Sequence, residues 1–162
     1  SSYGDCLTRG VCSDIIIIGS DNSKLQHTPT GLCASQGNDV EALRYHKEHR
    51  GLHNDTGRQA TWCSDYLACI WCKYFRTVAE PEHVWQLLSY RDYVLADMKA
   101  SISNIEGNDQ QAEAIEVLNR RVNDILTQLS IKNAQAVEQA ITMQREKGMH
   151  PFWSFAISTV TV

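Results

Sequence analysis

The feature that most constrains this chain is an apolar stripe of helical period in its C-terminal half. Its members recur at alternating steps of three and four residues, which places them on one face of an α-helix. They are Ile115, Leu118, Val122, Ile125 and Leu129. Two heptads are too few for a free-standing coiled coil, so we expect this helix to pack against another as an antiparallel hairpin. The partner is predicted over residues 82–105, with the apolar residues Val84, Leu88, Leu95, Met98, Ile102 and Ile105 on one side.

Local signals predict where the helices of this half begin and end. Pro81 suits a first helical turn, and Asp109 follows a Gly-Asn turn as an N-cap. The apolar pattern changes phase between Ser130 and Asn133, which indicates a kink or a break. The helix then resumes to about residue 147, where Gly148 ends it.

Two further helices are predicted before residue 80. A capping pattern and Gly51 bound a short helix over residues 39–50. Aromatic and apolar residues recur every four positions over residues 59–79, which predicts the most apolar helix of the chain. Charged residues interrupt this segment at Asp65, Lys73 and Arg76, so core packing explains its aromatic residues better than contact with a membrane.

Two segments have the composition of strands. Residues 15–18 are four consecutive isoleucines, typical of a short, central strand covered on both faces. Residues 152–162 are aromatic, β-branched or small, without a charge, Gly or Pro, and predict a C-terminal strand. Pairing these two strands gives the simplest sheet. Because the N-terminal strand is too short to cover its partner, the open edge predicts self-association, as a homo-oligomer, or strand addition to a protein partner.

Composition supports a single domain, since 162 residues with 43% hydrophobic side chains can build one core. The expected fold class is α+β and mainly α, with three to four packed helices and a small sheet of the N-terminal and C-terminal strands. Residues 1–37 are expected to be irregular apart from the strand at 15–18, and residues 39–147 helical. Five glycines interrupt the first 37 residues, so this segment needs another means of attachment to the core.

The cysteines suggest how the first 37 residues are attached to the core, because all six cysteines lie in the first 72 residues. We expect three disulfides that join the irregular segment to the predicted 59–79 helix. Each would link one of the first three cysteines to one of the last three, although six cysteines allow 15 pairings. The six are Cys6, Cys12, Cys33, Cys63, Cys69 and Cys72. With a glycosylation sequon at Asn54, this pattern favours a secreted, extracellular protein.

An alternative interpretation is an intracellular, cytoplasmic zinc protein. His46 and His49 would share a helix face, and Cys69 and Cys72 would complete four ligands. The same Cys-X-X-Cys pair is not expected to act as a redox centre, because the predicted helix places it far from a helix N-terminus.

Function is less constrained than fold. The nucleotide-binding and hydrolase motifs G-x-x-x-x-G-K-[ST], G-x-G-x-x-G and G-x-S-x-G do not occur. A net charge of −4 gives no general attraction to nucleic acid. We therefore expect a non-enzymatic protein without a cofactor that acts by binding, as an effector or toxin or as a subunit of an extracellular assembly.

Overall fold

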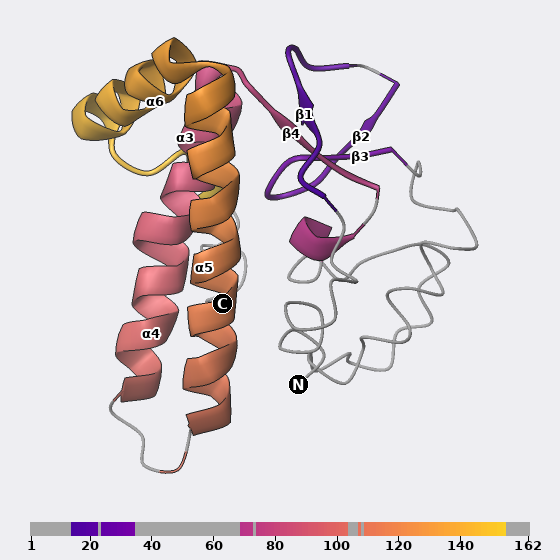
Figure 1. Cartoon of the computed structure of the whole chain (residues 1–162). Coiled ribbons are helices and arrows are strands. Elements are labelled where there is room, and N and C mark those ends of the chain that lie inside the picture. The colour runs from indigo at the N-terminus through magenta and orange to yellow at the C-terminus, as the bar shows by residue number, and fades with distance from the viewer. Residues whose placement is uncertain are drawn as a thin grey trace. The chain divides into compact units, whose positions relative to one another are not determined.

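The computed structural model describes residues 14–22, 24–34, 69–72, 74–103, 107 and 109–154. The chain is mainly helical with a small mixed sheet (Figure 1). It divides into two compact units, residues 1–78 and residues 79–162, which we describe separately. No helix among the described residues combines the length and the hydropathy needed to span a membrane. The helix expected at residues 39–50 lies outside the described residues.

The first unit contains a four-stranded sheet of very short strands. The strands are β1 (Ile17–Ile18), β2 (Gln26–His27), β3 (Leu32–Cys33) and β4 (Phe75–Val78), in the order β1-β4-β3-β2. β1 runs parallel to β4, and the other pairs are antiparallel. The strand predicted at residues 15–18 is thus confirmed at Ile17–Ile18. Its predicted central position is wrong, because β1 lies at the edge of the sheet formed by the described strands, next to β4.

The helix predicted over residues 59–79 is wrong in its described part. Cys69–Trp71 form a single 3₁₀ turn, η2, and β4 follows it. The residues of this strand are largely aromatic or β-branched, which favours extended backbone once strand partners are available on both sides. A spacing of four residues is also two periods of a strand, so the apolar pattern alone could not distinguish the two structures.

A close backbone approach at Gly31 sets the β3–β4 contact. A Cβ atom added there would lie 2.5 Å from the carbonyl oxygen of Arg76 and 2.8 Å from the Phe75 ring. No side chain fits at these distances without movement of the backbone of β4.

Replacing Gly31 with alanine is therefore expected to destabilise the sheet by about 1–3 kcal/mol, the usual cost of overpacking. Faster hydrogen exchange of the β3 and β4 amides would report the loss. Gly19→Ala is the matched control, because nothing lies within 4 Å of a Cβ at that position. Equal exchange rates in the two variants would contradict the predicted clash.

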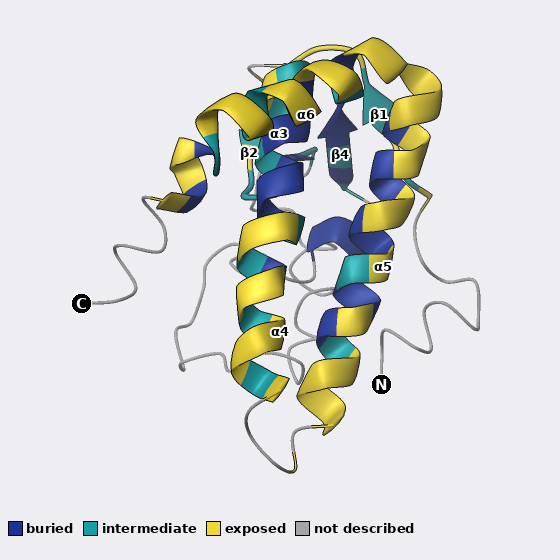
Figure 2. Ribbon diagram, turned by 90° about the vertical axis from the view of Figure 1, so that its left-hand side faces the viewer, coloured by how far each residue is buried: buried dark blue, intermediate teal, exposed yellow. Residues whose placement is uncertain are grey.

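The second unit is built from helices. They are α3 (Pro81–Ser89), the π-helical segment η3 (Tyr90–Leu95), α4 (Ala96–Ser103), α5 (Asp109–Lys132) and α6 (Ala134–Lys147). α5 contacts η3 and α4, which confirms the predicted hairpin for this part of its partner. The α3 part is different, because α3 packs mainly along α6. All five members of the apolar stripe are buried, and Figure 2 shows α5 with buried and exposed faces. The N-terminal helix boundary at Pro81 is also confirmed.

The predicted break between α5 and α6 falls at Asn133. Its side chain accepts a hydrogen bond from the Ala136 amide at 3.2 Å, as an N-cap does. The same side chain donates to the Ala79 carbonyl at 3.2 Å, so it also attaches the start of α6 to Ala79, which lies just before the N-cap of α3. Gly148 ends α6 with a φ of 79°, as predicted, in a backbone region that favours glycine.

The predicted C-terminal strand is wrong in its described part. Residues 151–154 form a helical turn that begins at Pro151. The indole of Trp153 donates to the Gln86 carbonyl at 2.8 Å, so contacts with α3 replace strand pairing. Residues 155–162 lie outside the described residues, and self-association through them stays a prediction.

Candidate functional site

A π-helical segment separates α3 from α4. Residues 90–95 form this segment, and the helix continues as α-helix on either side. π-helical insertions are uncommon and occur frequently at functional sites, because they offset the side chains that follow them. The surroundings of η3 are therefore a candidate site in the helical unit.

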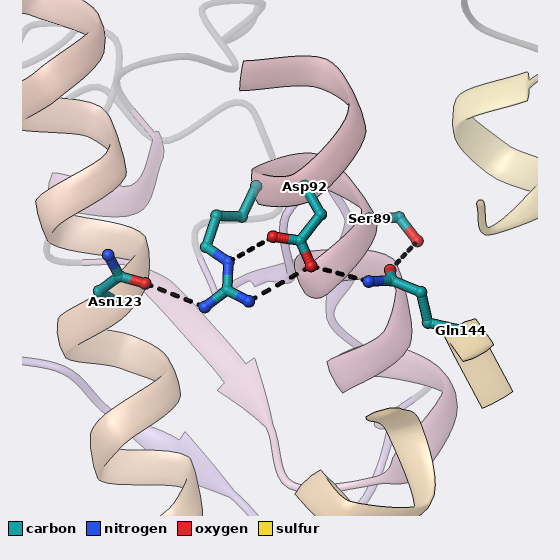
Figure 3. A network of polar contacts seen from close by, with 5 residues as sticks. Ser89, Asp92, Asn123 and Gln144 are labelled. Carbon is teal, nitrogen blue, oxygen red and sulfur yellow. Dashed lines mark hydrogen bonds and ion pairs between the residues drawn. The ribbon is translucent and has the colours of Figure 1, made fainter. Parts of the chain in front are cut away.

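A polar network surrounds this segment (Figure 3). The Ser89 hydroxyl donates to Gln144 Oε1 at 3.1 Å, and Gln144 Nε2 donates to Asp92 Oδ2 at 2.7 Å. Arg91 donates to both carboxylate oxygens of Asp92, at 2.8 and 3.3 Å. Its remaining terminal nitrogen donates to Asn123 Oδ1 at 3.0 Å. The network thus connects α6, the start of η3 and α5.

A groove lies between η3 and α4 on one side and α5 on the other. We call it the α4–α5 groove; its volume is about 370 Å³, within the range of ligand sites. Buried Leu95 and Ile115 form part of its lining. The other lining residues are Arg91, Asp92, Ala96, Lys99, Glu116, Asn119 and Asn123.

Two polar bridges cross the groove. Arg91 bonds to Asn123, and Lys99 Nζ lies 3.3 Å from Glu116 Oε1. The two α5 residues that receive these bridges are seven positions apart, which is about 10 Å along an α-helix. Asn119 lies between them in the sequence and on the same helix face. The space between the bridges matches about three residues of extended polypeptide.

The Lys99–Glu116 bridge can open at little cost in free energy. Its side chains are 68% and 53% exposed, and an ion pair this accessible contributes about 0–1 kcal/mol, because water competes for both partners. In the other bridge Arg91 also pairs with Asp92, so the loss of its bond to Asn123 does not leave its charge without a partner. A ligand with charges of both signs could exchange with the two bridges while the apolar lining stays in place.

A second cluster has the residue types of a hydrolytic triad but not its geometry. Ser89, His150 and Glu82 lie close together, and His150 Nε2 is 3.5 Å from Glu82 Oε1. The contact between Ser89 and His150, however, joins the hydroxyl to the backbone N–H at 2.9 Å. The imidazole Nδ1 instead accepts from the Phe152 amide at 3.0 Å. A base must reach the nucleophile's proton, so this arrangement does not activate Ser89.

The sequence-predicted thiols are only partly described. No disulfide joins Cys33, Cys69 and Cys72 to one another within the part of the chain that the structure describes. Cys69 and Cys72 belong to the η2 turn and its end, so their expected mid-helix position is wrong. Both are nevertheless buried, whereas reactive thiols are usually partly exposed. The remaining predicted disulfide partners, Cys6, Cys12 and Cys63, lie outside the described residues.

The predicted zinc ligands are not brought together in the described part of the chain. His46 and His49 lie outside it, as does the candidate glycosylation site Asn54. Among described residues, no group of three or more His, Cys, Asp or Glu side chains is placed to hold a metal ion. Zinc binding by His46, His49, Cys69 and Cys72 therefore stays a prediction.

No protein-family model, curated protein or solved structure matches the chain significantly. The α4–α5 groove was not predicted from the sequence, because Asp92 and Glu116 stand beside the apolar positions of their helices, where solvated acids are ordinary. The sequence holds one signal for it. Glu116, Asn119 and Asn123 follow one another at helical spacing beside the apolar stripe, which predicts a polar strip at the border of a helix interface.

Proposed function

We propose that this protein is a secreted, disulfide-stabilised and non-enzymatic binding protein whose helical unit holds a short charged segment of a protein partner in the α4–α5 groove. The observation that carries the proposal is the pair of polar bridges, Arg91–Asn123 and Lys99–Glu116, which cross a groove partly lined by apolar residues. A partner segment with an acid and a base about three residues apart could replace both bridges at once.

The chemistry of the lining supports a peptide as the occupant. An incoming acid would pair with Arg91 or Lys99, and an incoming base with Asp92 or Glu116. The Asn119 side chain between the bridges offers both a donor and an acceptor, which suits the N–H and C=O groups of an extended backbone. Leu95 and Ile115 supply an apolar surface for small side chains.

The test uses two short peptides of defined sequence, Ac-Glu-Ala-Ala-Lys-NH₂ and Ac-Lys-Ala-Ala-Glu-NH₂. We expect at least one of them to shift the side-chain amide NMR resonances of Asn119 and Asn123, with a weak dissociation constant of about 1 mM or below. Lys99→Gln should reduce the shifts, while Lys132→Gln at the end of α5 serves as the matched control. Equal shifts with the uncharged Ac-Gln-Ala-Ala-Gln-NH₂, or none with either charged peptide, would contradict the proposal.

The secreted and disulfide-stabilised part of the proposal rests on the even cysteine count and on the sequon at Asn54. Intact mass after alkylation, with and without reductant, counts the thiols and reveals a glycan. Six alkylatable thiols in the unreduced native protein would contradict the three disulfides. Stoichiometric zinc that is lost on His46→Ala would favour the intracellular alternative instead.

A further inference from the structure

The residues after α6 turn back onto α3. We call residues 148–154 the return segment. The indole N–H of Trp85 donates to the Gly148 carbonyl at 2.8 Å, and the Trp153 ring stacks on Tyr90 with centroids 5.0 Å apart. Trp85, Tyr90 and Trp153 are all buried, so this segment is packed against α3 and η3 as part of the core.

The His150 imidazole acts as the N-cap of the helical turn at residues 151–154. The imidazole Nδ1 accepts the hydrogen bond from the Phe152 amide at 3.0 Å. The backbone carbonyl oxygen of His150 accepts a second bond, from the Trp153 amide, also at 3.0 Å. A backbone N–H can only donate, so Nδ1 carries no proton in this structure. The usual capping residues Asn, Asp and Ser accept such a bond at neutral and mildly acid pH. Imidazole accepts it only while neutral, because both nitrogens of imidazolium are donors.

The surroundings of His150 oppose its protonation. The residue is 8% exposed, and its Nε2 lies 3.5 Å from Glu82 Oε1, which is longer than a well-formed hydrogen bond. Burial lowers the pKa of His150 below its ordinary 6.5; the nearby Glu82 carboxylate raises it and His83 lowers it further. Glu82 is 3.5 Å away but 74% exposed, so water weakens its attraction.

The other groups packed here do not favour the charged form. The Trp85 ring meets the imidazole edge-on with centroids 4.6 Å apart. Lys147 Nζ lies 5.7 Å from the centroid of the same Trp85 ring, which places a further positive charge beside this site. Of the charged groups in the described part of the chain that shift the pKa of His150, Glu82 is acidic and His83 is basic.

We propose that His150 is a pH-sensitive latch, which holds the return segment on α3 at neutral pH and releases it in mild acid by losing its capping bond to Phe152. Release would separate Trp153 from Tyr90 and uncover the Trp85 and Tyr90 rings on α3 and η3. The device is independent of peptide binding in the α4–α5 groove, and either can fail without the other.

Linkage between protonation of His150 and docking of the return segment determines in which direction docking depends on pH. The released segment binds the proton with the ordinary pKa of 6.5, and the docked segment binds it less tightly. The docked state is therefore fully stabilised above pH 6.5 and loses that stabilisation as the pH falls from 6.5 through the lowered pKa.

The indole N–H groups of Trp85 and Trp153 provide the measurement, because each donates to a backbone carbonyl only in the docked state. Their ¹⁵N NMR resonances, assigned from Trp→Phe variants of the four tryptophans, are followed from pH 8 to pH 5. We expect both resonances to move reversibly together, with a midpoint below pH 6.5. Resonances that stay unchanged to pH 5 would overturn the proposal.

Two variants separate the latch from general acid unfolding. His150→Asn keeps a capping acceptor that does not titrate, so the transition should disappear. Glu82→Gln removes the carboxylate that favours imidazolium, so the midpoint should move to lower pH. A transition unchanged in His150→Asn would overturn the proposal, and if that variant does not fold, an unchanged midpoint in Glu82→Gln would overturn it.

Discussion

Replacing Ile125 with alanine is expected to lower the free energy of unfolding of the helical unit by about 2–5 kcal/mol. Ile125 is 0% exposed and lies in the middle of the apolar stripe of α5. The substitution removes buried apolar surface and leaves a cavity in a packed interface, and both effects act in the same direction. Urea unfolding followed by far-UV circular dichroism measures the loss.

The control is the same substitution at Ile131, nearer the C-terminal end of α5. Ile131 is 82% exposed, so Ile131→Ala should change the free energy of unfolding by no more than about 0.5 kcal/mol. The pair holds residue type and helix constant and varies burial alone. Similar losses in both variants would mean that the stripe is not what stabilises α5 in the fold.

The helices of the second unit could be predicted because their determinants are local. The apolar stripe needs only the periodicity of α5, and its five members are all buried. The boundary signals are equally local. Asn133 caps α6 with its own side chain, and Gly148 ends that helix with a positive φ that few other residues adopt.

The sheet could not be predicted in the same way. Its strands have two to four residues, too few to show a pattern, and β4 pairs with β1 and β3 from far along the chain. The residues of β4 also continue an apolar spacing of four, so the local pattern favoured a helix. β4 is a strand because it pairs with its neighbours, and its pairing with β3 includes the close approach of Gly31 to Arg76. These two residues are 45 positions apart in the sequence.

The polar network beside the α4–α5 groove could not be predicted for a related reason. Gln144 reaches Ser89 across 55 positions and Asp92 across 52, so no local motif contains these residues. The π-helical segment beside them is also set by context, since its residues show no departure from an ordinary helical pattern. His150 is similar. Its role as a cap depends on the turn that follows it in the fold, which no local pattern predicts.

Replacing Trp85 with alanine should have an effect at least as large as that of Ile125→Ala, about 3–5 kcal/mol. The indole is 6% exposed, donates to the Gly148 carbonyl and meets the His150 ring. Its loss would leave a large cavity between α3 and the return segment and a carbonyl without its donor. Thermal unfolding measures the total effect, and hydrogen exchange at residues 148–154 should rise the most.

Trp85→Phe separates the two contributions of this side chain. The variant keeps an aromatic ring in the site and removes the N–H donor, so we expect a smaller loss of about 1–3 kcal/mol from the unpaired Gly148 carbonyl. If Trp85→Ala cost no more than Trp85→Phe, the ring would contribute nothing beyond its hydrogen bond. A larger loss in Trp85→Ala than in Trp85→Phe would instead show that aromatic packing on α3 holds the return segment in place. The His150 cap would then set the pH below which the segment is released.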